Sequence, residues 1–535
     1  MDPARIAPVL AGKWTKLLAC GALAAAVAAA GCGDEDGAAT DLTGFAPADA
    51  VVFAEGAIKP EGDRKDSVEA ILERFPNGDQ VGSRLVEELN SSIKEDGSDA
   101  TYEDDIEPWL GETAAFFATS FSAGDDGDNE LEQGAFIVET TDEDQAREKI
   151  REFAEEEGGP VEEQEYEGIS YDLSEDDSGD PIAAGVFDGV AVVGTERGFK
   201  DAVDAAAGES LSTESSYADF RDGLGDELMG SLYADGQGIL DAIPASPGFS
   251  QQQRRQLRRT YGQYLEEPIL GALAVTDDQA TLEFSAAATE AGIGAGQASP
   301  LLESGFADSW AASAIPDIGR SFGTAFSQAA SQLPRAEINQ VNSQLQRQLG
   351  FSLDDISDIG DAAFFAAGES ITELQVGGLF EVPDADARDR LLDAIRTGVQ
   401  RSGQGRIEPL NVEGADDGFA IRLPDLPVPI NVAAAGERVA VGVGPSTTAL
   451  LSGDGGLTDS ESFQSATEAV GEGSALNLLV EFAPIVALVE STGQDDADFA
   501  EAREYLDAME FVAVGTEQDG DRASSRFVVN FSDSE

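Results

Sequence analysis

Two short stretches of this chain are close copies of each other. Residues 106–121 read IEPWLGETAAFFATSF, and residues 356–371 read ISDIGDAAFFAAGESI. Gly111 corresponds to Gly360, so the copies are 360 − 111 = 249 residues apart. In both, a glycine precedes an Ala-Ala-Phe-Phe-Ala run that is short, apolar and bounded by turn residues, which is typical of a buried strand. The repeat predicts a chain in which one folding unit occurs twice in tandem.

The similarity extends on both sides of these stretches and predicts two units, residues 42–290 and residues 301–533. A chain of 535 residues is too long for a single hydrophobic core. Asp188 and Gly189 form a strong hairpin signal in the first unit, and the second unit has a matching turn at 436–437. Such hairpins are joined to single amphipathic helices. We therefore predict an α+β fold of two tandem homologous units, each a mainly antiparallel sheet packed with helices.

The N-terminus has the features of an export signal. Positive residues precede an apolar run at 17–30, which is shorter than the ~20 residues that a membrane-spanning helix needs. The sequence Ala-Ala-Gly-Cys at 29–32 resembles the lipobox of bacterial lipoproteins. This resemblance implies a lipoprotein signal peptide at 1–31, cleavage after it and a diacylglyceryl group on Cys32. The polar, Gly-rich residues 32–41 are then the lipidated cysteine and a flexible tether.

Two other interpretations of the N-terminus stay open. Residues 17–20 form a rival lipobox that ends in Cys20, with almost no apolar run before it. Cleavage near Ala30 without lipidation would release a secreted protein. With two acyl chains on Cys32, the body would be held stably at the extracytoplasmic face of the cell membrane, and this is the localisation that we predict.

The chain is strongly acidic, with a formal net charge of −72 and no histidine. Such a surface repels nucleic acid, so we predict no nucleic-acid partner. The acidity is typical of a solvated surface that keeps an exported protein soluble, with adaptation to high salt or weak buffering of divalent cations as alternatives. Lack of histidine, and of cysteine after Cys32, excludes a Ser-His-Asp triad, a His-ligated zinc and an internal disulfide in the mature chain. We expect no catalytic residues, no metal ligands and no cofactor.

One local exception to the acidity is a group of four arginines, which are Arg254, Arg255, Arg258 and Arg259. Their spacing puts them on one face of a helix. The plain interpretation is a connecting helix whose arginines pair with acidic neighbours. The alternative hypothesis is a docking face for phospholipid headgroups or for an acidic partner.

Four short motifs carry a resemblance to a known family. They are PADA at 47–50, WLGE at 109–112, YEG at 166–168 and GESLS at 208–212. With them the chain resembles a family catalogued as domain of unknown function number 3352, whose members are exported bacterial proteins and often lipoproteins. The resemblance covers most of the mature chain. It implies no activity, because none is known for the family.

These observations predict a lipid-anchored extracytoplasmic protein that is not an enzyme and acts as a binding or scaffolding component of the cell envelope. Its partners would be the membrane, through acylated Cys32, and an envelope protein or lipid that the sequence does not identify. One alternative is a carrier of a lipid or other apolar ligand between sheet and helices. The phenylalanine pairs at 116–117 and 364–365 would line its cavity, or else simply pack in the cores. A hydrolase that uses only carboxylates is the second alternative.

Overall fold

The computed structural model describes residues 40–532 apart from 96–97, 99, 124–128, 157–159, 176–179, 223–227, 246–251, 253–254, 256–257, 260–261, 263–264, 289–297, 331–341, 345, 348–351, 425, 427, 454 and 494–496. The predicted signal peptide, Cys32 and all but the last two residues of the predicted tether therefore lie outside the described residues. The chain divides into two compact units, the first up to Ala287 and the second from Ala288.

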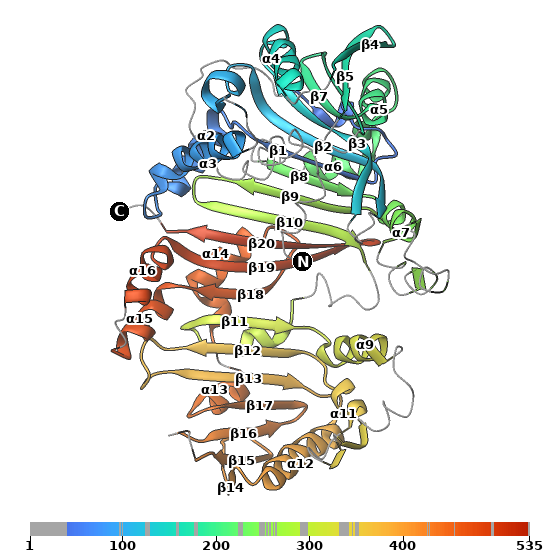
Figure 1. The fold of residues 1–535 in the computed structure, drawn as a ribbon. Coiled ribbons are helices and arrows are strands. Elements are labelled where there is room, and N and C mark those ends of the chain that lie inside the picture. The colour runs from blue at the N-terminus through green and yellow to red at the C-terminus, as the bar shows by residue number, and fades with distance from the viewer. Residues whose placement is uncertain are drawn as a thin grey trace. The chain divides into compact units, whose positions relative to one another are not determined.

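The strands of the first unit form an antiparallel sheet in the order β4-β5-β6-β7-β3-β2-β1-β8-β9-β10 (Figure 1). Their bounds are β1 Val52–Ala57, β2 Leu110–Ala123, β3 Asn129–Thr140, β4 Glu162–Tyr166, β5 Ile169–Glu175, β6 Pro181–Phe187, β7 Val190–Thr195, β8 Leu228–Ala234, β9 Ile269–Val275 and β10 Gln279–Ala287. The helices of this unit include η3 Leu42–Phe45, α2 Gly62–Leu72, α3 Val81–Glu95, α4 Glu143–Glu156, α5 Glu196–Ala207, α6 Ser215–Asp222 and α7 Gly236–Ala245.

The strands of the second unit form an antiparallel sheet in the order β14-β15-β16-β17-β13-β12-β11-β18-β19-β20. Their bounds are β11 Ser309–Ile315, β12 Ala362–Ala367, β13 Gln375–Glu381, β14 Arg406–Pro409, β15 Asp417–Arg422, β16 Ile430–Ala435, β17 Arg438–Val443, β18 Ala475–Glu481, β19 Met509–Asp519 and β20 Arg522–Phe531. The helices of this unit include η9 Pro300–Ser304, α9 Ile318–Ala330, α11 Leu353–Ser357, α12 Ala385–Ser402, α13 Ser446–Ser452, α14 Glu461–Ala469, α15 Ala483–Ser491 and α16 Ala497–Leu506.

The predicted α+β class with antiparallel sheets is confirmed. The local turn chemistry explains part of it. Asp188 and Gly189 both have positive φ, 48° and 79°, and join β6 to β7 in register, with Phe187 opposite Val190. Positive φ at both central residues is what a two-residue hairpin of type I′ requires.

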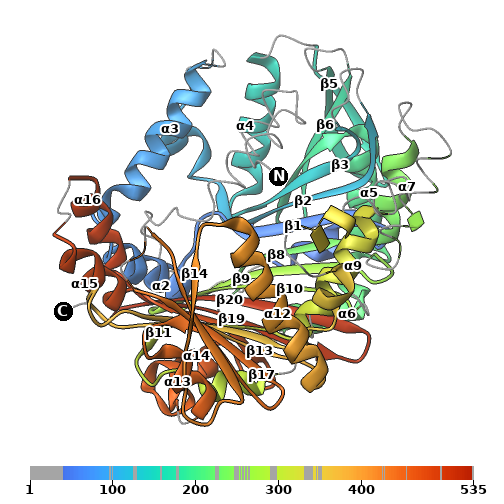
Figure 2. The same ribbon diagram turned by 90° about the horizontal axis from the view of Figure 1, so that it is seen from below.

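The two faces of the second sheet are covered differently. On one face, buried Ala363, Phe365 and Leu379 form a core with η9 and α13. On the other face, α12 covers the side of the sheet made by β14 to β17. Figure 2 shows α12 on one side of this sheet and α13 and α14 on the other. We call the face that carries α12 and Phe364 the open face, because the helix covers only part of it.

Candidate functional site

The open face of the second sheet contains an apolar hollow of about 450 Å³. Aliphatic and aromatic side chains, glycines and the single hydroxyl of Ser313 line it, and the full lining is Ala311, Ala312, Ser313, Phe364, Phe365, Ala366, Val376, Gly377, Gly378, Phe380, Ile430, Val441, Gly442, Val443 and Leu478. No side chain of this lining is titratable. The hollow can therefore neither transfer a proton nor hold a charge, and what it offers a ligand is apolar contact.

Strand alternation puts two large apolar side chains of the hollow in contact with solvent. Phe364 is 40% exposed and Val376 is 42% exposed. The neighbouring Phe365 points to the opposite face and is 2% exposed, because successive residues of a strand face opposite sides of the sheet. Covering a large apolar side chain is favourable by roughly 1 kcal/mol or more. A ligand that covers Phe364 and Val376 gains this free energy.

A glycine shapes the floor of the hollow. A Cβ atom on Gly378 would lie only 3.2 Å from Cδ1 of Phe364 and 3.2 Å from Cε2 of Phe380. These two rings pack edge to face, with centroids 5.6 Å apart and an interplanar angle of 84°. An added Cβ at position 378 would require both rings to move by a few tenths of an ångström, so the glycine allows them to pack this closely over the strand.

Helix α12 stands beside the hollow on the same face. Its Leu392 packs on Phe419 and Val439 of the sheet, and the partly buried Ile430 and Val441 belong to this cluster. Ile430 and Val441 also line the hollow. The packing of the helix thus continues directly into the lining of the hollow.

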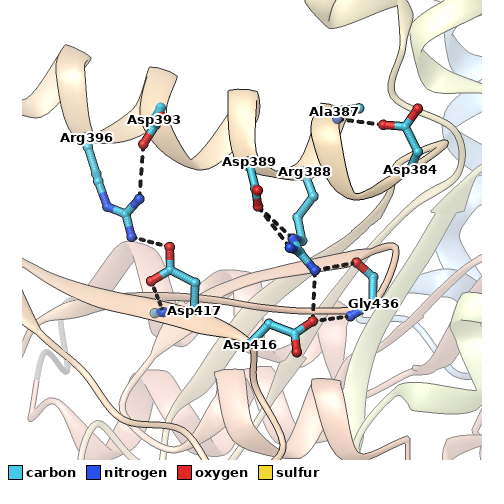
Figure 3. Close-up of polar contacts among 10 residues, drawn as sticks. Asp384, Ala387, Arg388, Asp389, Asp393, Arg396, Asp416, Asp417 and Gly436 are labelled. Atoms are coloured by element: carbon cyan, nitrogen blue, oxygen red, sulfur yellow. Dashed lines mark hydrogen bonds and ion pairs between the residues drawn. The ribbon is translucent and has the colours of Figure 1, made fainter.

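The N-terminal part of α12 is fastened by a carboxylate and an arginine (Figure 3). Asp384 caps the helix by accepting a hydrogen bond of 2.7 Å from the amide of Ala387. Arg388 donates to Asp416 at 2.8 Å and to the carbonyl oxygen of Gly436 at 3.0 Å. Asp416 also accepts a 2.9 Å hydrogen bond from the amide of Gly436, so one carboxylate ties the helix to the β16–β17 turn.

A second arginine fastens the middle of α12. Arg396 donates to Asp417 at 2.6 Å, and its guanidinium lies 4.5 Å from the centroid of the Phe419 ring (Figure 3 shows the ion pair). The hydrogen bond from Arg396 lowers the pKa of Asp417 below its usual value, as do the guanidinium charge and the amide of Gly418. These contacts fix the position of the helix that borders the hollow.

In the first unit, Glu139 binds the end of the predicted tether. Its Oε1 accepts hydrogen bonds from the amide and the hydroxyl of Thr40, at 3.1 and 2.9 Å. Its Oε2 accepts bonds from the amides of Glu112 and Thr113 and from the Thr113 hydroxyl, at 3.0, 3.2 and 3.1 Å. Arg221 pairs with the next residue, Asp41, at 3.2 Å. The point at which the tether joins the body is therefore fixed.

A buried carboxylate of the first unit belongs to a polar network under α6. Glu55 lies 2.8 Å from Arg221 and accepts a 2.8 Å hydrogen bond from Ser231, which in turn contacts the hydroxyl of Tyr217 at 2.5 Å. Burial raises the pKa of Glu55, although the nearby arginine opposes this effect. The network joins α6 to β1 and β8, and it lies outside the hollow of the second unit.

The predicted arginine face is only partly within the described residues. Arg254 and the predicted lipidation site Cys32 lie outside them. Arg255, Arg258 and Arg259 are exposed, and Arg258 contacts Asp241 of α7. The proposed docking role of these arginines stays a prediction.

The two predicted phenylalanine pairs are each split between the faces of a strand. Phe117 and Phe365 are buried in the cores of their units. Phe116 packs on Phe136 with centroids 4.8 Å apart, and Phe364 forms part of the hollow. Sequence reasoning missed Val376 and Gly378, the latter part of a Gly-Gly pair at 377–378 that signals close packing over a strand.

Within the described residues, neither a metal-binding cluster nor a helix able to span a membrane is found. In that part of the chain, no three Asp, Glu, Cys or His side chains are grouped as a metal ion would require. None of the helices described is both long and apolar enough to cross a membrane.

The fold and the hollow define an α+β protein with antiparallel sheets and an apolar candidate binding site. The chain belongs to the family described as "Protein of unknown function (DUF3352)", whose model matches residues 76–414. This confirms the resemblance seen in the sequence. No curated protein matches the chain.

Two solved structures of TP0453, in crystal forms I and III, are similar to parts of this chain. Form I has a TM-score of 0.25 at 11% identity, over 48% of this chain and 82% of TP0453. Form III has a TM-score of 0.24 at 10% identity, over 48% of this chain and 83% of TP0453. The similarity is too low to support an argument about function.

Proposed function

We propose that this protein is a lipid-anchored, non-enzymatic component of the cell envelope, built as a tandem repeat of one α+β unit. The repeat is supported by the strand orders, since the second sheet reproduces the first strand for strand. In the first unit, the Ala-Ala-Phe-Phe strand is β2, which lies between β1 and β3. In the second unit it is β12, which lies between β11 and β13. The anchor is supported by the lipobox that ends in Cys32.

The function that we propose is binding of an acyl chain in the hollow of the second unit. The observation that carries it is the lining, in which Phe364 and Val376 are exposed and no side chain is titratable. The volume of about 450 Å³ falls within the range of about 300 to 1,000 Å³ that is usual for small-molecule sites.

An acyl chain suits this lining better than a peptide does. Strand β12 is hydrogen-bonded to β11 on one side and to β13 on the other, and β13 is bonded to β17, so the floor offers no free strand edge. A peptide lying on it would bury backbone polar groups without partners, which costs free energy. An acyl chain has no such groups.

The test is titration of residues 33–535, the processed chain without the lipidated cysteine, with a fluorescent fatty acid. We expect Phe364→Asp to weaken binding at least tenfold, because it puts a carboxylate into the hollow. Phe322→Asp is the matched control, since Phe322 is also 40% exposed but lies on α9, outside the lining.

Native mass spectrometry of the same chain, as purified, gives a second result. A bound mass that disappears on organic extraction would support the proposal and identify the lipid. Equal fatty-acid affinity of the two aspartate variants would refute it, and recovery of a bound peptide would favour a scaffolding role.

A further inference from the structure

Two loops of the second unit leave the same end of its sheet. Strand register shows this, because Ala367 pairs with Gln375, Ile430 with Val443 and Ile421 with Ile430. The loop at 368–374 joins β12 to β13, and the loop at 423–429 joins β15 to β16. Three strand spacings separate the middles of the two loops, which is about 14 Å at ~4.8 Å per spacing.

Both loops expose aliphatic side chains to solvent. Ile371 is 62% exposed, and Leu426 and Val428 are each 45% exposed. We call these three residues the aliphatic rim. Each is more exposed than Phe364 or Val376 in the hollow. Scattered apolar residues are common on protein surfaces, but three at one end of one sheet call for an explanation.

The first loop is held in a defined shape that keeps Ile371 outside. Gly368 has φ +94°, and its carbonyl oxygen accepts a 3.1 Å hydrogen bond from the indole of Trp310. Within the loop, the amide of Glu373 donates to the carbonyl oxygen of Ser370 at 3.0 Å, and the Ser370 hydroxyl donates to Glu373 at 2.9 Å. Because the turn is fixed before any contact is made, little conformational entropy is lost on binding.

The hollow extends to the end of the sheet that carries the rim. Val376, Ile430 and Val443, which all line the hollow, are the second residue of β13, the first of β16 and the last of β17. The register of these strands puts all three at the end from which the two loops leave. The rim and the hollow thus adjoin.

We infer that the aliphatic rim inserts into the interface of a lipid bilayer, at the place where an acyl chain passes between bilayer and hollow. This inference rests on the proposed function. The rim's aliphatic side chains lie on separate loops, which suits a fluid apolar phase better than a shaped protein partner. The predicted acyl group on Cys32 brings a bilayer to this chain.

The charges near the rim specify the kind of bilayer. Glu369 and Glu373 are exposed in the same loop as Ile371, and the chain as a whole is strongly acidic. Anionic headgroups would repel these carboxylates, so the rim fits a zwitterionic surface. Binding should then be driven by apolar burial and change little with salt.

The experiment measures partition of residues 33–535 onto phosphatidylcholine vesicles by flotation. We expect the triple variant Ile371→Ser, Leu426→Ser, Val428→Ser to partition at least tenfold less. Leu282→Ser, which replaces a 39% exposed leucine of the first unit, should partition like the unchanged chain.

Failure of the inference and failure of the proposed function give different results. If the rim acts as inferred, the triple variant binds a fatty acid from solution as the unchanged chain does, whereas Phe364→Asp binds it at least tenfold more weakly. Partition of the triple variant equal to that of the unchanged chain would overturn the inference. So would an absence of partition by the unchanged chain. The inference would also be overturned if the unchanged chain partitioned only onto vesicles that contain anionic lipid. Loss of that partition in the triple variant Arg255→Glu, Arg258→Glu, Arg259→Glu would then favour the arginine face.

Discussion

The glycines that align the two repeated stretches have different surroundings. A Cβ atom on Gly111 would lie 2.5 Å from Cγ and 2.8 Å from Cβ of Glu139. A Cβ atom on Gly360 would come no closer than 3.5 Å, to the carbonyl oxygen of Glu381. Glu139 is held by its hydrogen bonds to Thr40 and Thr113, so it has little freedom to move aside.

We predict that Gly111→Ala lowers the free energy of unfolding by about 1 to 3 kcal/mol, the usual cost of overpacking a filled site. Gly360→Ala should change it by less than about 0.5 kcal/mol, because the contact is an ordinary van der Waals one. Urea unfolding followed by tryptophan fluorescence measures both, since Trp109 and Trp310 report on separate units. Equal effects of the two substitutions would show that the close contact is not the cause.

At the scale of elements, α12 is placed by charged contacts as well as by its apolar face. The hydrogen bond from Arg396 lowers the pKa of Asp417 in the folded chain. A carboxylate with a lowered pKa binds fewer protons in the folded state than in the unfolded state. Its contribution to stability is therefore present above the unfolded pKa of about 4 and is lost as the pH falls through the folded pKa.

We predict that Asp417→Asn destabilises the chain by about 0.5 to 1 kcal/mol at pH 7, a modest value because the pair is partly exposed. The difference from the unchanged chain should shrink as the pH falls below about 4. Chemical denaturation across this range measures it. Asp393→Asn is the control, since Asp393 meets the same arginine from a more exposed position, 76% against 43%. A difference that stays constant with pH would refute the assignment.

Local elements could be predicted from the sequence, and their arrangement in space only in part. The hairpin at Asp188 and Gly189 depends on two adjacent residues, so its signal is complete in the sequence. The Phe-Phe runs indicated strands correctly, but not that Phe364 would stay exposed on one face of its strand. That exposure depends on how far α12 extends across the open face, which is set by contacts such as Arg388 with Asp416, 28 residues apart. Periodicity does not carry this information.

At the scale of the whole molecule, we expect the predicted lipidation of Cys32 to decide where the protein is found. We predict that Cys32→Ser moves the protein from the detergent phase to the aqueous phase in a phase-partition experiment, because the change removes the site of the proposed diacylglyceryl anchor. Cys20→Ser is the matched control and should leave partition unchanged. The opposite pattern would identify the rival lipobox as the one in use.

The contact between Glu139 and Thr40 sets the length of the predicted tether. From Cys32 to Thr40 there are 40 − 32 = 8 residues, which span at most about 29 Å when fully extended. With Cys32 lipidated as proposed, so short a tether would hold the first unit near lipid headgroups at an effective concentration in the range of millimolar. Contacts of modest affinity between this chain and the bilayer would then suffice to keep it at the membrane surface.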